Sequence, residues 1–385
     1  YPLRRQRQMC IRDSVQSLEN FGSRFQYNEN RKEIANWLKD QFTAMGYEQV
    51  ELDSFLVITR YNNNVPVMQY NVVATLTGST RPDEIYIIGG HYDSYNQTGD
   101  PHVFAPGADD NASGTASALE TARAIKSAGY QPSATIKFVC FAAEELMLSG
   151  NSGSEYMAEK YREQNINLKL MINNDMIANN PRPLNESMVS VNYYTGSETL
   201  KDIAMSLMDQ YSVVTPMEGG RDVWTDSRSF HEEGFPAIYY DEYDFSPNYH
   251  TSNDVIANCD MEYCTEVIKG SAAMLIYSVE SPSPVHNLNV FDFGDGATLV
   301  FTWSPNTDSD FKEYKLYSGR SADSLDYIDS ITDTTFNLTG LSDGVKYFFG
   351  VSASDFDGNE TLLTKVSAVP NKLPKAPGGV QAIPA

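Results

Sequence analysis

Residues 134–145 read ATIKFVCFAAEE, a nearly all-apolar run that ends at two adjacent glutamates. β-Branched and aromatic side chains dominate the run, which is typical of a strand buried on both faces of a parallel sheet. Further segments of strand character lie at 70–78, 84–90, 168–175, 188–194 and 235–241. The repetition of such short strands predicts a large buried sheet.

Helical patterns separate these predicted strands. Residues 29–46 place apolar side chains from Ile34 to Met45 at helical spacing, and Gly46 follows as a C-cap. Further helical patterns lie at 113–128, 150–164, 198–211 and 225–233. Strands alternating with helices predict an α/β domain over residues 15–280, with a mostly parallel central sheet and helices on both faces.

The composition narrows the class of protein. The chain of 385 residues is 41% hydrophobic, enough for a sizeable core, and has a formal net charge of −23. Such an acidic chain lacks the basic face that nucleic-acid binding needs. It has no run of 18 apolar residues, so no transmembrane helix is expected. An acidic surface suits a secreted protein kept soluble by its charge, although no signal peptide is present in this fragment.

The first 14 residues differ from the rest of the chain. They carry four arginines against one aspartate and lack the apolar core of a signal peptide. The string QMCIRD at 8–13 resembles one translated frame of a transposon-based sequencing adapter. We therefore predict that residues 1–14 are an artefact. The alternative is a basic pro-segment.

The sequence pattern changes at 280–286, which predicts a second domain. Residues 281–286 form a Ser/Pro-containing linker, and residues 287–371 contain only strand patterns with turns about every ten residues, typical of an all-β sandwich. Trp303 is expected to be buried, and Tyr347, six residues after Leu341, resembles the tyrosine corner of fibronectin type III domains. Residues 372–385 resemble a linker and the truncated start of a further module.

Ionisable side chains follow the predicted strands at their carboxyl ends. His91 and Asp93 follow 84–90, Glu144 and Glu145 follow 134–143, and Asp175 ends 168–175. The loop PGADDNASG at 106–114 adds Asp109, and Tyr249 and His250 come after 235–241. Because ligands of open α/β sheets bind at the carboxyl ends of the strands, these groups are expected to meet there.

The donor types point to zinc. Histidine nitrogens and carboxylate oxygens suit this ion, and five ligands with one shared can hold two ions roughly 3.5–4 Å apart. A sixth carboxylate could then act as a base. Asp93 either orients the imidazole of His91 or merely caps a turn. The other three histidines, His102, His231 and His286, are expected to be structural or exposed.

Five motifs in order, GGHYDS, PGADDNASG, AAEELMLSGNSGSEYM, NNDMI and YHTSND, resemble the zinc aminopeptidases of metallopeptidase family 28, of the bacterial leucyl aminopeptidase type. The resemblance implies a zinc exopeptidase fold, two Zn²⁺ ions and a peptide substrate with a free N-terminus. It implies Glu144 as general base, and Tyr249 either as an oxyanion-stabilising residue or as a wall of the pocket. It also implies a cis bond between Asp109 and Asp110. The implied metal ligands are His91, Asp109 (shared), Glu145, Asp175 and His250.

The sequence departs from the family pattern near the predicted substrate pocket. Ser227 stands where a histidine is usual, and no cysteine occurs between 141 and 258. A carboxypeptidase or dipeptidase of the same fold, which would need a basic residue such as Arg221 or Arg228, therefore remains an alternative. A glutaminyl cyclase with one zinc and a non-enzymatic adhesion protein are others. Cys259 and Cys264 could form a short disulfide or remain thiols.

Overall fold

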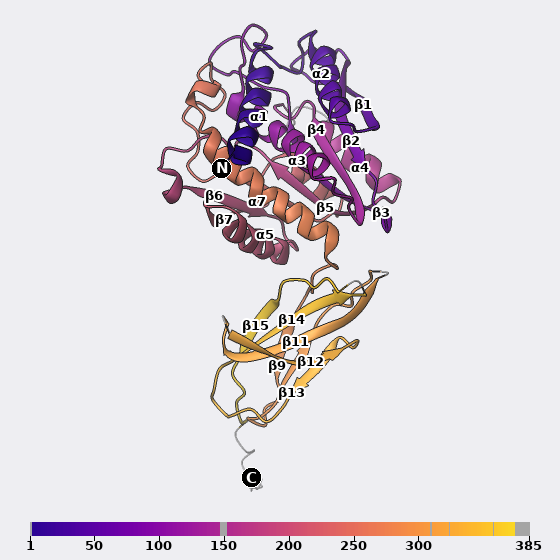
Figure 1. Cartoon of the computed structure of the whole chain (residues 1–385), viewed down its shortest axis with the longest axis vertical. Coiled ribbons are helices and arrows are strands. Elements are labelled where there is room, and N and C mark those ends of the chain that lie inside the picture. Colours follow the sequence, from indigo (N-terminus) through magenta and orange to yellow (C-terminus); the bar gives the residue numbers. More distant parts are fainter. Residues whose placement is uncertain (1, 147–151, 309, 323, 357, 374–385) are drawn as a thin grey trace, which may run out of the picture. The chain divides into compact units, whose positions relative to one another are not determined.

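A computed structural model describes residues 2–146, 152–308, 310–322, 324–356 and 358–373 (Figure 1). The chain divides into two compact units, Tyr1–Glu280 and Ser281–Ala385. Each unit has its own hydrophobic core. The units are described separately below.

The first unit is built on one eight-stranded sheet. Its four middle strands, in the order β4, β3, β5, β8, run parallel, and the flanking pairs β1–β2, β2–β4 and β6–β8 are antiparallel. The prediction of a mostly parallel central sheet is confirmed for this middle part. The strands in sheet order are β1 (Gln49–Val57), β2 (Val67–Leu76), β4 (Ala134–Phe141), β3 (Arg81–His91), β5 (Asn167–Asn174), β8 (Ala237–Glu242), β6 (Met188–Tyr193) and β7 (Thr215–Arg221).

Helices cover both faces of this sheet. Ile88 and Ile87, neighbours on β3, belong to two different core clusters, because successive side chains of a strand point to opposite faces. Five helices bury residues in the cluster of Ile88, and two bury residues in the cluster of Ile87. The first group is α1 (Pro2–Glu19), α2 (Arg31–Ala44), α3 (Gly114–Ala128), α5 (Glu198–Tyr211) and α7 (Met261–Glu280), and the second is α4 (Gly153–Glu163) and α6 (Asp226–Glu232).

The N-terminal segment that the sequence led us to set aside is helical. It forms most of α1, which lies against α3 and α7 (Figure 1). Ile11 is buried in the core together with Val15 and Leu18 from the same helix. An amphipathic segment packs in this way whatever its origin, so the assignment of residues 1–14 as an artefact stays a prediction.

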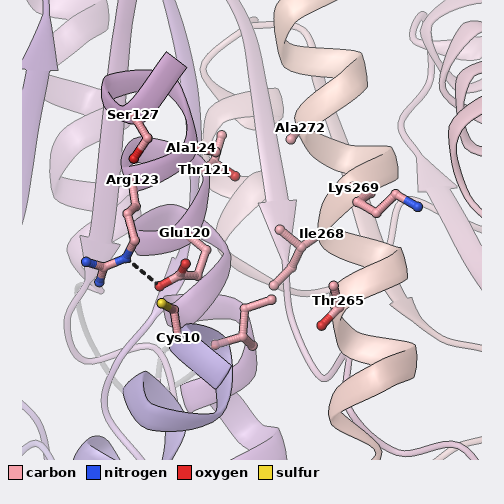
Figure 2. A pocket seen from close by; sticks show the side chains of 11 residues that line it. Cys10, Glu120, Thr121, Arg123, Ala124, Ser127, Thr265, Ile268, Lys269 and Ala272 are labelled. Carbon is pink, nitrogen blue, oxygen red and sulfur yellow. Dashed lines mark hydrogen bonds and ion pairs between the residues drawn. The ribbon is translucent and has the colours of Figure 1, made fainter. Parts of the chain in front are cut away.

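A pocket of about 310 Å³ opens between α1, α3 and α7 (Figure 2). Glu120 and Arg123 form an ion pair of 3.0 Å along one side, and Ile268 and Lys269 of α7 lie on the other. None of the residues predicted to be functional lines this pocket. The predicted site therefore lies elsewhere in the first unit.

The second unit consists of two antiparallel sheets. Phe301 of one sheet stacks on Phe349 of the other with ring centroids 3.8 Å apart, and Trp303 is buried in the same core, as predicted. The sheets thus enclose one core, as in a β-sandwich. The strands are β13 (Thr335–Leu338), β10 (Leu299–Thr302) and β9 (Asn289–Asp292) in one sheet, and β12 (Ser324–Ile331), β11 (Phe311–Ser321), β14 (Tyr347–Asp355) and β15 (Thr364–Ala368) in the other.

In the described part of the chain, every helix is too short or too polar to cross a membrane.

Candidate metal centre

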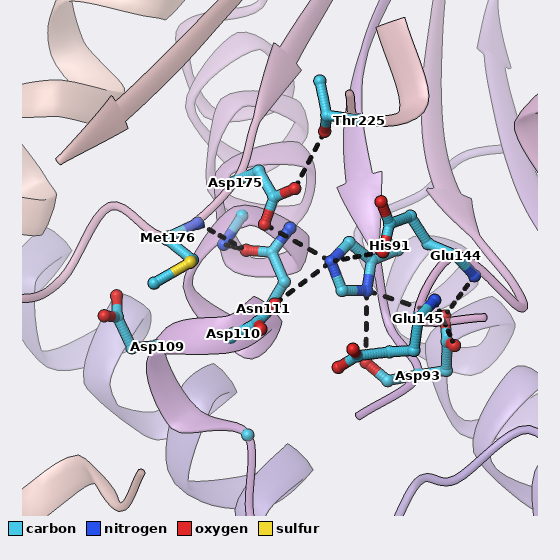
Figure 3. Close-up of polar contacts among 12 residues, drawn as sticks. His91, Asp93, Asp109, Asp110, Asn111, Glu144, Glu145, Asp175, Met176 and Thr225 are labelled. Carbon is cyan, nitrogen blue, oxygen red and sulfur yellow. Dashed lines mark hydrogen bonds and ion pairs between the residues drawn. The ribbon is translucent and has the colours of Figure 1, made fainter. Parts of the chain in front are cut away.

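The ionisable residues predicted from the strand ends converge at the carboxyl edge of the parallel strands (Figure 3). His91 is the last residue of β3, Asp175 directly follows β5, and Glu144 and Glu145 follow β4. His250 lies in the segment between β8 and α7. The parallel arrangement brings these residues together because all four strands end at the same edge of the sheet.

The His91 imidazole lies at the centre of three carboxylates. Its Nε2 atom is 3.3 Å from Oδ1 of Asp110, 3.3 Å from Oδ1 of Asp175 and 3.7 Å from Oε2 of Glu144. The other ring nitrogen, Nδ1, lies 3.6 Å from Oδ1 of Asp93. The side chain is almost fully buried, so the ring is held on both sides by groups of the protein.

A second group of carboxylates surrounds the imidazole of His250. Its Nε2 atom is 2.7 Å from Oε2 of Glu145 and 3.1 Å from Oδ2 of Asp110. The ring of Tyr249 stacks on the imidazole with centroids 3.7 Å apart. The two oxygens of Asp110 therefore face two different histidines, Oδ1 toward His91 and Oδ2 toward His250.

Asp110 occupies the position that the sequence led us to expect for Asp109. The Asp109 side chain points away from the histidines, and its Oδ1 atom accepts the backbone N–H of Ala178 at 2.8 Å (Figure 3). The chain turns sharply here, with φ −107° and ψ 92° at Asp110, so adjacent side chains leave the turn in different directions. The cis peptide bond also lies one residue later than predicted, between Asp110 and Asn111.

Asp93 supports the glutamate pair as well as His91. Its carboxylate accepts the backbone N–H of Glu144 at 3.0 Å and that of Glu145 at 3.2 Å. One buried carboxylate therefore links the end of β3 to the segment after β4. Nδ1 of His91 lies closer to the Asp93 backbone carbonyl, at 3.2 Å, than to its carboxylate, so the orienting role of the Asp93 side chain stays a prediction. The link to the glutamates was not predicted.

Sequence reasoning missed three further supporting residues. The Thr225 hydroxyl donates to Oδ2 of Asp175 at 2.8 Å. The Asp254 carboxylate accepts the backbone N–H groups of Asp109 and Asp110 at 2.8 and 3.0 Å. Asp254 lies in the motif YHTSND, which drew attention only through its tyrosine and its histidine.

The third missed residue is Arg24. It is buried, and its guanidinium donates to the carbonyls of Tyr92, Pro106 and Gly107 at 2.7, 2.6 and 2.7 Å. Burial lowers the pKa of Arg24 to about 10, with nearby carboxylates opposing the shift. Arg24 thus ties the residue after His91 to the loop before Asp110. Its sequence context, SRF, carries no signal for this role.

The electrostatics of the site favour a bound cation. Burial raises the pKa of Glu145 to about 8 and that of Asp226 to about 7, and it holds the pKa of Glu144 well above its ordinary value. Burial also opposes ionisation of Asp110, but hydrogen bonds from His250 and His91 outweigh it and hold that pKa low. So many buried carboxylates are costly without a positive partner.

The donor set fits zinc. Ligand atoms of His91, Asp110 and Glu145, and separately of His91, Glu144 and Asp175, lie within 4.8 Å of one another. Ligands about 2.0–2.2 Å from a tetrahedral zinc are about 3.3–3.6 Å apart, close to the separations seen around His91. Among the described residues, Oε1 of Glu145 is buried without a hydrogen-bond partner, which is the state expected of an unused ligand atom.

The remaining residues that the sequence analysis singled out near the site each have few polar partners or none among the zinc ligands described above. Tyr249 is 38% exposed beside His250, in contact with the ring of Phe245. Ser227, at the position of the usual histidine, shares a hydrogen bond of 2.8 Å with the Tyr194 hydroxyl. Cys259 and Cys264 are both free thiols in this structure.

Comparisons with curated proteins give relatives of two kinds. A "probable zinc metalloprotease" of Pyrenophora teres f. teres is 38% identical over 183 residues, covering 44% of this chain and 38% of that protein. A "probable leucine aminopeptidase" of Arthroderma otae is 30% identical over 266 residues, covering 66% of this chain and 68% of that protein. The matched part of the chain thus spans well under half the length of the first relative.

Solved structures share the fold of the first unit. The Legionella pneumophila LapA aminopeptidase is 25% identical with a TM-score of 0.58, covering 71% of this chain and 72% of that one. A leucine aminopeptidase precursor from Bacteroides thetaiotaomicron is 17% identical with a TM-score of 0.59, covering 70% of this chain and 96% of that one. At this lower identity the likeness concerns the fold alone.

The match to a family model covers the residues that build the metal centre. It runs from residue 71 to residue 275, more than half of the chain, and so includes every candidate ligand from His91 to His250. The fold, the histidine–carboxylate cluster and this match lead to one conclusion: the chain belongs to peptidase family M28.

Proposed function

We propose that the first unit is a di-zinc aminopeptidase that removes N-terminal residues from peptides. The observation that carries the proposal is the position of Asp110, whose two carboxylate oxygens face His91 and His250 separately. A single carboxylate between two imidazoles is the arrangement expected of a ligand shared by two ions.

The ligands divide into two sets around Asp110. His91 and Asp175, whose ligand atoms are 3.3 Å apart, would hold one ion. Glu145 and His250, whose ligand atoms are 2.7 Å apart here, would move slightly apart to hold the other. Bound zinc would polarise the scissile carbonyl and lower the pKa of a coordinated water toward neutrality.

Glu144 is the proposed general base. Its Oε2 atom faces His91 at 3.7 Å, and its backbone is held by Asp93, so the carboxylate is fixed at the edge of the centre. A carboxylate in this place takes the proton of the attacking water and later donates it to the leaving amine. Tyr249, beside His250, would donate to the developing oxyanion or form a wall of the pocket.

The surroundings of the arginines favour an aminopeptidase over a carboxypeptidase. The Arg228 guanidinium stacks on Trp224 at 3.5 Å from the ring centroid and pairs with Glu232 at 2.7 Å. Arg221 is 60% exposed and lies 3.9 Å from Asp222. Both candidate receptors for a substrate carboxylate thus have acidic or aromatic partners of their own. A glutaminyl cyclase would need only one zinc.

A panel of aminoacyl anilides with free and acetylated amines tests this function. We expect the zinc-loaded protein to cleave the free substrates and leave the acetylated ones intact, and chelation to abolish cleavage. Cleavage of blocked substrates would refute an aminopeptidase. Metal analysis giving one zinc per chain would refute the di-zinc centre and favour the cyclase.

For the second unit we propose a fibronectin type III domain that acts as a spacer or attachment element. Support comes from the three-plus-four strand arrangement and from Tyr347, whose hydroxyl accepts the backbone N–H of Ser342 at 3.0 Å. We further propose that the protein is secreted, on the strength of its net charge of −23. Proteolytic release of the second unit with unchanged turnover would support the spacer role.

A further inference from the structure

The two histidines of the metal centre have different partners on their outer ring nitrogens. Nδ1 of His91 lies 3.2 Å from the backbone carbonyl of Asp93 and 3.6 Å from the carboxylate of the same buried residue. Nδ1 of His250 lies 2.9 Å from the side-chain amide of Gln97, an exposed residue. A histidine that binds a metal through Nε2 must carry its proton on Nδ1, so this atom needs an acceptor.

Gln97 can supply that acceptor. Its amide carries both a donor NH₂ group and an acceptor oxygen, and a half-turn about the last side-chain bond exchanges them. With Oε1 toward His250, the amide accepts the proton on Nδ1 and leaves Nε2 free to bind. The geometry already places Nε2 against Glu145 and Asp110.

Gln97 also holds the backbone of the same residue. Its N–H donates to the His250 carbonyl at 2.9 Å. His250 has φ +54°, a left-handed conformation that costs a non-glycine residue energy and needs support from its surroundings. Tyr95, two residues before Gln97, contacts the His250 ring edge-on at 5.3 Å. The loop after Asp93 therefore fixes His250 at its carbonyl and at its ring.

We propose that Gln97 is a positioning residue that selects the Nδ1–H tautomer of His250 and thereby sets the zinc affinity of the His250 side of the centre. This inference rests on the proposed di-zinc function. Because Gln97 is exposed and water competes for its amide, whereas the Asp93 groups beside His91 are buried, we expect the ion on the His250 side to be the more weakly held of the two.

The substitutions Gln97→Leu and Gln97→Glu separate this role from a general structural one. Leucine has a similar size but cannot accept the Nδ1 proton, whereas glutamate can only accept. Gln131→Leu is the matched control, since Gln131 is also exposed and donates to a single carbonyl, that of Thr77 at 2.9 Å, outside the centre.

The measurement is a Zn²⁺ titration of each apoprotein against a chromophoric chelator, with the unfolding midpoint recorded alongside. We expect Gln97→Leu to weaken the lower-affinity zinc by roughly 10–100-fold. The higher-affinity zinc and the unfolding midpoint of the apoprotein should stay close to those of the control. Gln97→Glu should bind the lower-affinity zinc at least as tightly as the unmodified protein.

The other outcomes overturn the proposal in distinct ways. Equal weakening by leucine and glutamate would mean that Gln97 acts as a donor, and no weakening by leucine would mean that it does not orient His250. Loss of both ions together with a lower midpoint would indicate only a structural role. Each of these results concerns Gln97 alone. The proposed function stands as long as the unmodified protein binds two zinc ions and cleaves free aminoacyl anilides. An unmodified protein that binds fewer than two ions refutes both.

Discussion

Asp254 holds the backbone at Asp110, because its Oδ2 atom accepts the Asp110 N–H at 3.0 Å. Its other oxygen accepts the N–H of Asp109 at 2.8 Å, so the carboxylate is hydrogen-bonded to the backbone of both residues of the turn. The position of the carboxylate that faces His91 and His250 therefore depends on a residue that is not itself a proposed zinc ligand.

The substitution Asp254→Asn should remove one of these two hydrogen bonds. An asparagine presents only one oxygen, so one backbone N–H loses its acceptor, at a cost of roughly 1–3 kcal/mol. We expect weaker zinc binding and a lower kcat. Asp260→Asn is the control for the lost charge, because both backbone N–H groups that Asp260 accepts, those of Glu262 and Tyr263, bond to one oxygen and can be kept by asparagine. Equal zinc affinity in the two variants would contradict the prediction.

The substitution Glu144→Gln tests the general base. Glutamine keeps the shape of the side chain but cannot take a proton, so we expect kcat to fall by roughly 10²–10⁴-fold while two zinc ions remain bound. Turnover of a leucyl anilide and metal content of the same preparation give both values. Normal turnover, or loss of a zinc ion with the proton acceptor, would remove Glu144 from this role.

Arg24→Met should affect both stability and zinc binding. Its loss leaves the carbonyls of Tyr92, Pro106 and Gly107 without their buried donor, which should cost at least about 2 kcal/mol of unfolding free energy. The control is Arg81→Met, another buried arginine, which donates to the carbonyl of Val279. Only the Arg24 variant should also bind zinc more weakly in a chelator competition. The same zinc affinity in both variants would limit Arg24 to a structural role.

Removal of zinc should destabilise the first unit. Without cations, the carboxylates of Asp110, Glu144, Glu145 and Asp175 crowd one buried site. We expect EDTA to lower the unfolding temperature and added Zn²⁺ to restore it, since a ligand that binds only the folded state stabilises it by mass action. An unchanged melting curve after complete metal removal would argue against ion binding at this cluster.

Asp241 should make the stability depend on pH. Burial raises the pKa of Asp241 to about 7, with a hydrogen bond from Asn192 opposing the shift. The folded state keeps this proton to a higher pH than the unfolded chain does. The contribution of Asp241 to the free energy of unfolding is therefore complete below about pH 3.9 and is lost as the pH rises through 7. Asp241→Asn should remove this loss. Urea unfolding at pH 5 and pH 8 should then show a smaller decrease for the variant than for the unmodified protein. Parallel decreases would contradict the shifted pKa.

The sequence predicted the central strands well because they are buried on both faces. The run at 134–143 became β4, Ala134–Phe141, and the run at 168–175 became β5, Asn167–Asn174. It missed β1 and β7, the two edge strands, where one side is exposed and the residues alternate or are polar. In β7 the sequence TPMEGGR has little strand propensity, and pairing with β6 determines its conformation.

At the site, residue type and strand order predicted which side chains meet but not how the turn directs them. Nothing in the stretch GADD distinguishes the two aspartates, because the difference lies in backbone angles at Asp110. Arg24 and Gln97 were missed for a related reason. Their partners lie far away in the chain, at Gly107 and His250, and only the folded structure brings them into contact.

The separation of Asp109 from Asp110 has a consequence for the lifetime of the protein. One carboxylate faces the metal centre, and the other is bonded to the backbone of Ala178, in the segment that follows Asp175. In the proposed di-zinc enzyme, loss of the ions would therefore release charge repulsion directly beside the bonds that join these two segments. Zinc supply would then govern how often the first unit opens, and metal-starved molecules would be the first to be degraded by proteases.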